Sequence, residues 1–297
     1  MQDYTTAELY EFISVAKEMK ASPYLYSDRL KGKTLGMIFQ KSSTRTRVSF
    51  EVAMYQLGGL GLFLSANELQ LGRGETIEDT AKVLSRYVDG IMARTYSHDD
   101  VVALAKDATV PVINGLSDYA HPCQAMADYL TIMEKKGQLQ GLKLAYIGDG
   151  NNVCHSLLIG ASKLGVNMSV ATPKHYEPSE TIVKLAKKNA QESGASIYST
   201  RDPKEAAAKA DVIYTDTWTS MGQEKEKAKR LKAFKDYQVN KKLFSLAKKD
   251  CIFMHCLPAH RGEEVTADIL DGKQSVVFDE AENRLHIQKA ILLILMD

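Results

Sequence analysis

Short apolar runs rich in β-branched residues alternate with longer helix-forming stretches along the whole chain, and this alternation constrains the fold most strongly. In the first half, strand patterns cover residues 35–39, 60–64, 90–93 and 110–113. Helix patterns between them cover residues 45–57, 76–87 and 99–106. Strands that alternate with helices form parallel sheets whose faces are covered by those helices.

The alternation starts again after a polar, glycine-containing turn that follows a helix pattern at 124–136. Strands are then predicted at 144–147, 168–171, 212–215, 252–255 and 276–278. Helices are predicted at 151–164 and 178–192, and a last one from about residue 281. A chain of 297 residues suits two domains. We expect an α/β fold of two doubly wound domains, each a parallel sheet flanked by helices.

Composition excludes several classes of protein. Lys plus Arg is 38 and Asp plus Glu is 37, so a net charge of +1 offers nothing global to nucleic acid or an anionic membrane. No apolar run approaches the roughly 20 residues that span a bilayer. The first residues lack the pattern of a signal or transit peptide, so we expect a cytoplasmic protein. The four cysteines include no C-x-x-C pair and suggest no disulfide framework.

Ligands of open α/β sheets bind outside the carboxyl ends of the strands, and polar residues follow the first predicted strand. Residues 42–47 read SSTRTR and lead directly into a helix. A helix N-terminus binds anions through its unpaired N–H groups and positive dipole end. Hydroxyls and arginine forks add donors that suit phosphate. A plain Ser/Thr cap followed by surface arginines is the alternative, but two closely spaced arginines favour an anion site.

The run Ser43-Thr44-Arg45-Thr46-Arg47 resembles the carbamoyl phosphate signature of the aspartate and ornithine carbamoyltransferases. The resemblance implies that Ser43 to Thr46 grip the phosphate and that Arg45 neutralises the bridging oxygen as phosphate leaves.

Two further segments are similar to this family and complete the implied carbamoyl phosphate site. Arg94 ends a strand and would contact phosphate and the carbonyl oxygen. His121 and Gln124 match an H-P-x-Q element, in which Gln124 would hold the carbamoyl NH2 group. Taken alone, a histidine before proline is more often structural. Donors that converge on the carbonyl oxygen would stabilise the charge that develops there.

The resemblance also concerns oligomer contacts and the end of the chain. Gln70 matches a glutamine that reaches carbamoyl phosphate in a neighbouring subunit, so a homotrimer or a multiple of trimers, with sites at subunit interfaces, is implied. Arg284 matches the last carbamoyl phosphate ligand, on a helix that returns to the first domain. The implied domains are 1–135 with 281–297 for carbamoyl phosphate, and 136–280 for ornithine.

The second half opens with Gly148-Asp149-Gly150, a near match to the dinucleotide fingerprint. This motif supports an alternative reading as an NAD(P)-dependent dehydrogenase. Val153 replaces the third small residue, however, and no acidic residue ends the strand near 168–172. In the resembled family, Asn152 at this place binds the α-amino and carboxylate groups of ornithine, whereas Asn151 fits an ordinary helix cap.

Two motifs later in the chain concern the acceptor amine. Asp216, Ser220 and Met221 fit the D-x-x-x-S-M-G pattern that separates ornithine from aspartate carbamoyltransferases; from the residues alone, Asp216 is little better than a capping aspartate. Cys256 and Leu257 fit an H-C-L-P element.

The H-C-L-P element invites two other readings, and both are weak. Adjacent strand residues point to opposite faces, so His255 is a poor base for a Cys256 nucleophile. A metal site through Cys251, His255, Cys256 and His260 matches no ordinary zinc spacing. The resemblance implies that Cys256 positions the ornithine amine beside Asp216, that the Leu257 carbonyl accepts from the carbamoyl amide, and that Leu257–Pro258 is cis.

The implied reaction transfers the carbamoyl group of carbamoyl phosphate to the side-chain amine of L-ornithine, giving L-citrulline and phosphate, with no cofactor or metal. The implied catalytic residues are Arg45, Arg94, His121, Asp216 and Cys256. Putrescine is the main competing acceptor, and it would not need Asn152 or the loop at 220–221. A homologue that binds carbamoyl phosphate without turnover is a further alternative.

Overall fold

The computed structural model describes residues 1–67, 69, 74–220 and 222–297 and divides into two compact units. The amino unit comprises Ala7–Leu130 and Glu282–Asp297. The carboxyl unit comprises Met1–Thr6 and Thr131–Ala281. The boundaries between them fall inside helices α5 (Pro122–Lys136) and α12 (Val277–Met296), so the last turns of the chain belong to the amino unit.

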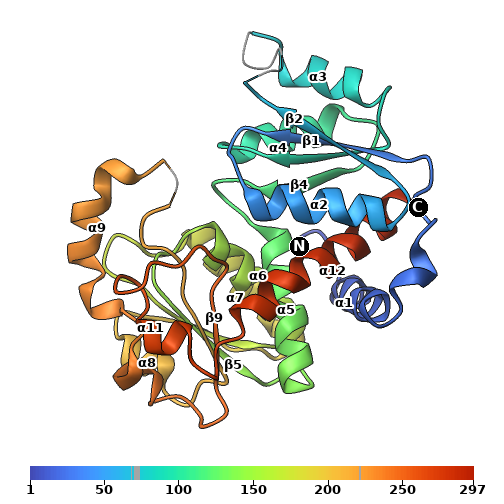
Figure 1. Ribbon diagram of the computed structural model, residues 1–297. Helices are drawn as coiled ribbons and strands as arrows, with labels where there is room; N and C mark the ends of the chain where they lie inside the picture. The colour runs from blue at the N-terminus through green and yellow to red at the C-terminus, as the bar shows by residue number, and fades with distance from the viewer. Residues whose placement is uncertain (68, 70–73, 221) are drawn as a thin grey trace. The chain divides into compact units, whose positions relative to one another are not determined.

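The amino unit contains a parallel sheet in the order β2-β1-β3-β4. Its strands are β1 (Thr34–Phe39), β2 (Leu60–Ser65), β3 (Gly90–Arg94) and β4 (Val112–Leu116). Its helices are α1 (Thr6–Ala21), η1 (Pro23–Tyr26), α2 (Thr44–Gln56), α3 (Ile77–Leu84) and α4 (His98–Asp107). Helices α2 and α3 lie on opposite sides of the sheet, so both of its faces are covered (Figure 1).

The carboxyl unit contains a second parallel sheet, in the order β7-β6-β5-β8-β9. Its strands are β5 (Lys143–Ile147), β6 (Asn167–Ala171), β7 (Ile197–Thr200), β8 (Val212–Tyr214) and β9 (Ile252–Met254). Its longer helices are α6 (Asn152–Leu164) and α7 (Glu180–Ser193). Shorter helices are α8 (Pro203–Ala207), η3 (Glu224–Glu226), α9 (Lys227–Ala233), η4 (Lys235–Tyr237), α10 (Lys241–Phe244) and α11 (Ala267–Leu270).

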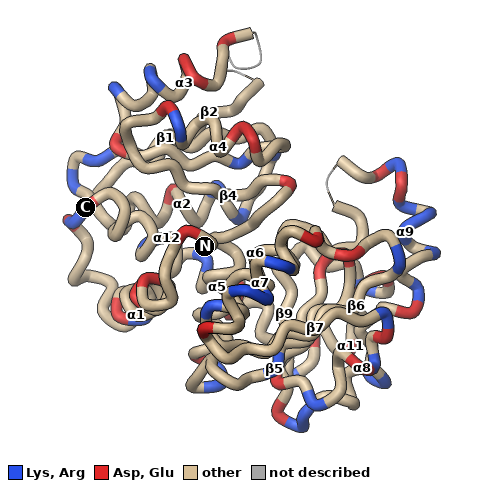
Figure 2. Tube along the Cα trace, turned by 180° about the vertical axis from the view of Figure 1, so that it is seen from behind, with Lys and Arg blue, Asp and Glu red and all other residues tan. Residues whose placement is uncertain are grey.

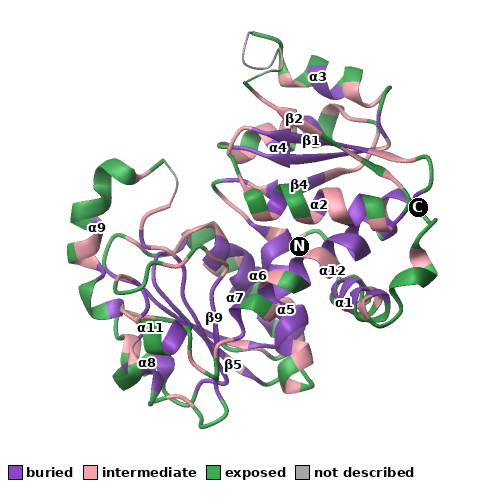
Figure 3. Ribbon diagram, viewed as in Figure 1, coloured by how far each residue is buried: buried purple, intermediate pink, exposed green. Residues whose placement is uncertain are grey.

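Burial explains why most strands could be recognised in the sequence. Every residue of β3, β8 and β9 is buried, and such strands appear as continuous apolar runs. Figure 3 shows buried residues along the β5 and β9 region and an exposed α9. The charge run at 224–237 falls on η3, α9 and η4; η3 and η4 carry its acidic residues, and the charged residues of α9 are all Lys or Arg (Figure 2). Helix α9 therefore has the solvated face that the sequence predicts.

The predicted fold class is confirmed, and three details of the prediction are wrong. Residues 276–278 are not a strand: α12 begins at Val277, so the last helix also starts before the predicted residue 281. The strand predicted at 110–113 is displaced to Val112–Leu116. Helix α1 and strand β7 were not predicted. No helix in the described part of the chain is long and apolar enough to cross a membrane.

Each sheet has one pair of neighbouring strands from whose carboxyl ends the chain turns toward opposite edges of the sheet. Ligands of such sheets bind outside the carboxyl ends of that pair. In the amino unit this point lies between β1 and β3, where Phe39 pairs with Arg94 and the Gln40 amide donates to the Arg94 carbonyl at 2.9 Å. In the carboxyl unit it lies between β5 and β8, whose ends lead to Asn151 and Asp216. Both points carry residues that the sequence marked as site candidates.

Candidate active site

The loop after β1 enters helix α2 through a serine cap and a buried threonine. Ser43 Oγ accepts a hydrogen bond from the Thr46 amide at 3.2 Å, so Ser43 is the N-cap of α2. Thr46 is fully buried, and its Oγ1 accepts from Arg284 Nη2 at 2.7 Å. The first turn of α2 thus combines backbone N–H groups, a positive dipole end and a buried arginine, which together suit an anion.

His121 lies buried at the start of α5 in a strongly positive environment. Burial lowers the pKa of His121 well below its usual value, and the charges of Arg284, Arg94 and Arg45 lower it further. Arg94 and Arg284 are themselves buried, with 7% and 3% of their surface exposed. Three guanidinium groups around one neutral imidazole form a centre whose charge calls for an anionic ligand.

Gln124, one turn after His121, is almost fully buried, and its side-chain amide has a defined orientation. Its Nε2 donates to Asp128 Oδ1 at 2.8 Å. A carboxylate can only accept this bond, so the NH2 end of Gln124 must face Asp128 and the amide oxygen must face away from it. That orientation presents an acceptor, which is what the predicted contact with a carbamoyl NH2 group requires.

Arg47 differs from Arg45, Arg94 and Arg284. It is exposed, and its guanidinium pairs with Glu51 at 3.0 Å and lies 3.8 Å above the Phe63 ring. The sequence argument counted both Arg45 and Arg47 toward the anion site. The structure brings only Arg45 near His121, and Arg47 behaves as a helix-surface arginine.

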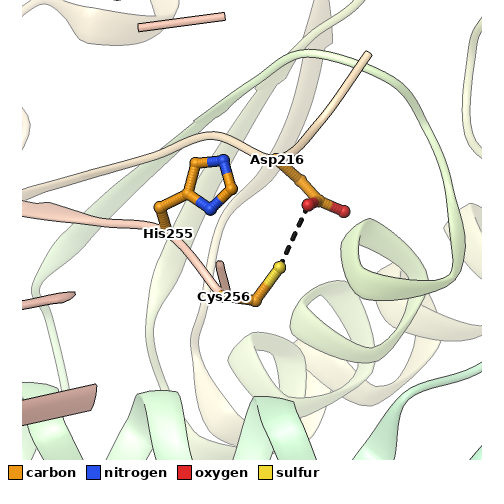
Figure 4. A group of neighbouring side chains, drawn as sticks. All are labelled: Asp216, His255 and Cys256. Atoms are coloured by element: carbon orange, nitrogen blue, oxygen red, sulfur yellow. Dashed lines mark hydrogen bonds between the residues drawn. The ribbon is translucent and has the colours of Figure 1, made fainter. Parts of the chain in front are cut away.

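Asp216 is the centre of the carboxyl-unit candidates. It follows β8, is 6% exposed, and Cys256 Sγ donates to its Oδ1 at 3.0 Å (Figure 4). The Thr217 amide also donates to Oδ1, and Asn151 Nδ2 donates to Oδ2 at 2.7 Å. Three donors fix the direction of this carboxylate, which can then receive an ammonium group in one defined place.

Asn151 has a second role that the sequence analysis missed. Its Oδ1 caps α6 by accepting from the Val153 and Cys154 amides, while its Nδ2 holds Asp216. An asparagine cap has an NH2 group separate from the oxygen that caps the helix, so it can cap and donate at the same time. This property was the sequence signal for a second role of Asn151. Asn152, the predicted ornithine ligand, is the first residue of α6 and half-buried.

Asp149 and Arg230 are further residues that the sequence analysis left without a role. Arg230 Nη1 donates to Asp149 Oδ2 at 2.8 Å and to the Trp218 carbonyl at 2.9 Å, and both side chains are buried. Burial raises the pKa of Asp149 to about 6 although Arg230 opposes the shift. Arg230 therefore links the turn after β5 to the segment that carries Ser220.

The turn after β9 has an unusual backbone. Leu257–Pro258 is cis, which confirms the prediction, and Leu257 has a φ of 56°. The Leu257 amide donates to His255 Nδ1 at 2.8 Å, and His255 Nε2 lies 3.2 Å from Glu264 Oε1. Both His255 and Glu264 are fully buried.

Two groups of possible metal ligands occur among the described residues, Asp216 with His255 and Cys256, and His260 with Glu263 and Glu264. Neither group includes Cys251. In the first group the hydrogen bonds of Asp216 to Cys256 and of His255 to Leu257 already use the atoms that would face an ion.

The geometry argues against the dinucleotide alternative. A Cβ on Gly150 would lie 2.2 Å from Pro178 N and 2.5 Å from Glu177 C. The second glycine of a dinucleotide fingerprint allows a pyrophosphate to approach the backbone, but here the chain segment at 177–178 occupies that space. Gly148, for its part, faces Thr215 and Asp216.

A surface cavity of about 880 Å³ also opens on the carboxyl unit, and it contains none of the predicted site residues. Its walls include Lys184 and Arg201, which pair with Glu180 and Glu177. These contacts are ordinary surface ion pairs.

Two predicted site residues, Gln70 and Met221, lie outside the described residues. Of their neighbours, Ser220 is half-buried, and its amide donates to Gln223 Oε1 at 3.2 Å.

Comparisons with known proteins cover nearly the whole chain. Residues 1–134 match the family model described as the aspartate/ornithine carbamoyltransferase, carbamoyl-P binding domain. Residues 140–295 match the Asp/Orn binding domain of the same family. The ornithine carbamoyltransferase of Thermococcus kodakarensis is 61% identical over 298 residues, covering 100% of this chain and 95% of the relative. The anabolic ornithine carbamoyltransferase of Pyrococcus furiosus is also 61% identical, with the same coverage.

Solved structures agree. The ornithine carbamoyltransferase from Pyrococcus furiosus superposes with a TM-score of 0.96 at 61% identity, covering 99% of this chain and 95% of that one. The enzyme from Thermus thermophilus gives 0.91 at 46% identity, with 99% and 96% covered.

Proposed function

The chain belongs to the aspartate/ornithine carbamoyltransferase family, and from that premise we propose that it transfers the carbamoyl group of carbamoyl phosphate to the side-chain amine of L-ornithine. The products are L-citrulline and phosphate, which places the reaction in arginine metabolism. The observation that carries the proposal is the positive centre around His121, where Arg45, Arg94 and Arg284 act on one buried imidazole.

In this proposal the amino unit binds carbamoyl phosphate. The first turn of α2, from Ser43 to Thr46, receives the phosphate through its N–H groups and hydroxyls, and Arg45 and Arg284 neutralise its charge. Gln124 Oε1 accepts from the carbamoyl NH2 group, and the family motif supports the Leu257 carbonyl as a further acceptor for this amide. These contacts give the carbamoyl group one orientation.

Arg94 and His121 act on the carbonyl oxygen in this proposal. Attack on the carbamoyl carbon puts negative charge on that oxygen, and preorganised donors at the oxygen lower the barrier most effectively. Because the pKa of His121 is held well below its usual value, the imidazole is neutral at neutral pH. A neutral imidazole donates one N–H and releases no proton, so His121 serves as a hydrogen-bond donor and not as a general acid.

The carboxyl unit binds ornithine through its acidic centre. Asp216 receives the side-chain ammonium with Cys256 beside it, and Asn152 binds the α-amino and carboxylate groups. Ser220 and Met221 are further proposed ornithine ligands. Putrescine would use Asp216 but has no α-carboxylate for Asn152, so the presence of both residues favours ornithine.

The reacting amine must lose a proton before it attacks, since a Lys-like ammonium has a pKa of roughly 10 in water. Asp216 favours the charged form and does not help this step. This first proton goes to water before the neutral amine attacks. The new C–N bond leaves the nitrogen positively charged, and the departing phosphate accepts the second proton from it as the C–O bond breaks. No protein base is then required.

We also propose that the chain assembles as a homotrimer or a multiple of trimers, with Gln70 reaching the site of a neighbouring subunit. Strand β2 at the sheet edge supports an interface, because it exposes Leu60 and Leu62, at 55% and 40%. Proteins usually cover an apolar edge strand. Light scattering should give three copies of 32.9 kDa or a multiple, and a monomer would contradict the assembly.

The cytoplasm is the proposed compartment, since all four cysteines are free thiols and such thiols persist under reducing conditions.

A steady-state assay tests the function. Carbamoyl phosphate is supplied with ornithine, putrescine, N-acetylornithine or aspartate, and the carbamoylated product is identified. Citrulline should form fastest. Absence of turnover with ornithine would reject the proposal, and faster turnover with putrescine would establish the competing acceptor. In a parallel assay NAD(H) is added to these samples, and a change in its absorbance would support the dehydrogenase alternative.

A further inference from the structure

The hydrogen bonds of His255 indicate which tautomer it adopts. The Leu257 amide can only donate, so His255 Nδ1, 2.8 Å away, must be the unprotonated nitrogen. The proton therefore sits on Nε2, which donates to Glu264 Oε1 at 3.2 Å. Glu264 also accepts from the His260 amide. A fully buried carboxylate thus selects the tautomer of a fully buried histidine.

This tautomer matters because of the backbone that it holds. Leu257 has a φ of 56°, in the left-handed region that a leucine seldom adopts. Such a conformation persists only when its surroundings enforce it. The bond from the Leu257 amide to His255 Nδ1 is one constraint on this residue. Cys256 directly precedes Leu257 in this turn, and its Sγ lies 3.0 Å from Asp216 Oδ1.

We propose that Glu264, acting through His255, is a positioning residue that sets the conformation of the turn at 256–258. Neither side chain touches a substrate. Glu264 holds the His255 proton on Nε2, His255 Nδ1 holds the Leu257 amide, and the turn aims the Leu257 carbonyl and the Cys256 thiol. The catalytic part of this inference rests on the proposed function, since it takes those two groups to face the carbamoyl amide and the ornithine amine.

The contacts from Glu264 through His255 to the Leu257 amide are called the relay below. Two substitutions of His255 separate its contact with Glu264 from its contact with Leu257. In His255→Asn, the amide oxygen takes the place of Nδ1 and can still accept from the Leu257 amide. In His255→Gln, the amide reaches the place of Nε2 and contacts Glu264, but nothing accepts from Leu257. We expect His255→Gln to lower kcat about 10- to 100-fold, because a small misplacement of reacting groups costs that much. His255→Asn should keep kcat within about fivefold.

Glu264 is tested with its neighbour as a control. Glu264→Leu should lower kcat in the same range as His255→Gln, whereas Glu264→Gln, which retains an oxygen acceptor, should restore most of it. Glu263 lies one residue away, pairs with Lys227 at 2.8 Å and has no part in the relay. Glu263→Gln should therefore leave kcat unchanged.

A second readout needs no turnover. Cys123, Cys154 and Cys251 are buried and Cys256 is half-buried, so iodoacetamide should modify Cys256 first. Because the Asp216 contact ties down the thiol, a loosened turn should speed alkylation at least fivefold in His255→Gln and Glu264→Leu, but not in His255→Asn.

Equal kcat values and equal alkylation rates in His255→Gln and His255→Asn would overturn the inference, as would full activity of Glu264→Leu. If the unaltered protein makes no citrulline, the proposed function fails, while the alkylation rates still decide whether the relay holds the turn.

Discussion

Arg284 Nη2 donates to Thr46 Oγ1 at 2.7 Å, joining the last helix to the first turn of α2 across 238 residues of sequence. Both side chains are buried, and both belong to the amino unit. The segment Glu282–Asp297 therefore completes a centre that begins directly after the first strand. The proposed anion site therefore needs both an early segment of the chain, the first turn of α2, and a late one, helix α12.

Thr46→Val removes one hydroxyl and keeps the shape of the side chain. A hydrogen bond to a charged group contributes roughly 1.5–3 kcal/mol, so we expect the KM for carbamoyl phosphate to rise at least about tenfold. Thr46→Ser keeps the hydroxyl and should stay within about threefold of the unaltered protein. Steady-state kinetics with carbamoyl phosphate as the varied substrate distinguishes the two, and equal KM values would show that the hydroxyl has no role in binding.

Asn151→Ser separates the two functions of Asn151. Serine still caps α6, but it cannot donate to Asp216 as Asn151 Nδ2 does at 2.7 Å. We expect kcat/KM for ornithine to fall about tenfold while the free energy of unfolding changes by less than about 1 kcal/mol. Asn151→Ala should lose the cap as well and unfold more easily, by about 1 kcal/mol. Unchanged kinetics in both variants would show that Asp216 needs no support from Asn151.

Asp149 should give the stability of the protein a pH dependence. Burial raises its pKa from 3.8 to about 6, so the folded protein holds this proton more tightly than the unfolded chain. The resulting stabilisation is fully present below pH 4 and is lost as the pH rises through about 6.

Two pKa units correspond to about 3 kcal/mol, and Asp149→Asn has no such titration. The free energy of unfolding of the unaltered protein, minus that of Asp149→Asn, should therefore fall by about 2–3 kcal/mol between pH 4 and pH 7. Denaturant titrations at several pH values measure it. The surface variant Asp236→Asn should follow the unaltered protein, and a constant difference for Asp149→Asn would contradict the raised pKa.

The ends of most strands could be recognised in the sequence. Arg94 ends β3 and Asp216 follows β8, so parallel-sheet topology alone brings each to a point where ligands bind. The family membership that the motifs implied is confirmed by similarity over the whole chain. The positions of these strand ends needed only the order of the elements, whereas the roles of Arg94 and Asp216 were implied by the family motifs and stay predictions.

Features that depend on contacts between residues far apart in the sequence could not be predicted. The apolar residues 276–278 look like a strand, but a short apolar run does not separate a strand from the start of a buried helix. Arg47 and Arg45 look equivalent in sequence, yet Arg47 pairs with Glu51 on the helix surface. The link from Asp149 to Arg230 crosses 81 residues and leaves no local pattern.

Gly150→Ala tests the crowded turn that argues against the dinucleotide alternative. Its Cβ would meet backbone atoms of residues 177–178 at 2.2–2.7 Å, and backbone cannot give way as a flexible side chain can. We expect a loss of about 1–3 kcal/mol in the free energy of unfolding. Gly36→Ala, whose Cβ would make ordinary contacts at 3.5 Å with Leu64 and Val88, is the matched control. Equal stabilities would mean that the space beside Gly150 is open.

Cys256→Ala asks whether the thiol attacks or only positions. In the structure Cys256 donates to the Asp216 carboxylate, and a carboxylate is a far weaker base than a thiolate. His255 Nδ1 and Nε2 are engaged with Leu257 and Glu264, so the neighbouring imidazole does not serve as the base. A nucleophile without a base is a poor one.

We therefore expect Cys256→Ala to retain turnover, with a loss of about 10- to 100-fold from poorer placement of the amine. Mass spectrometry of the unaltered protein with carbamoyl phosphate alone should detect no carbamoyl adduct. Loss of all activity in Cys256→Ala, together with a trapped carbamoyl–cysteine, would establish covalent catalysis and replace direct attack by the amine. Cys123→Ala, at a buried thiol whose pKa burial raises to about 11, controls for modification elsewhere in the chain.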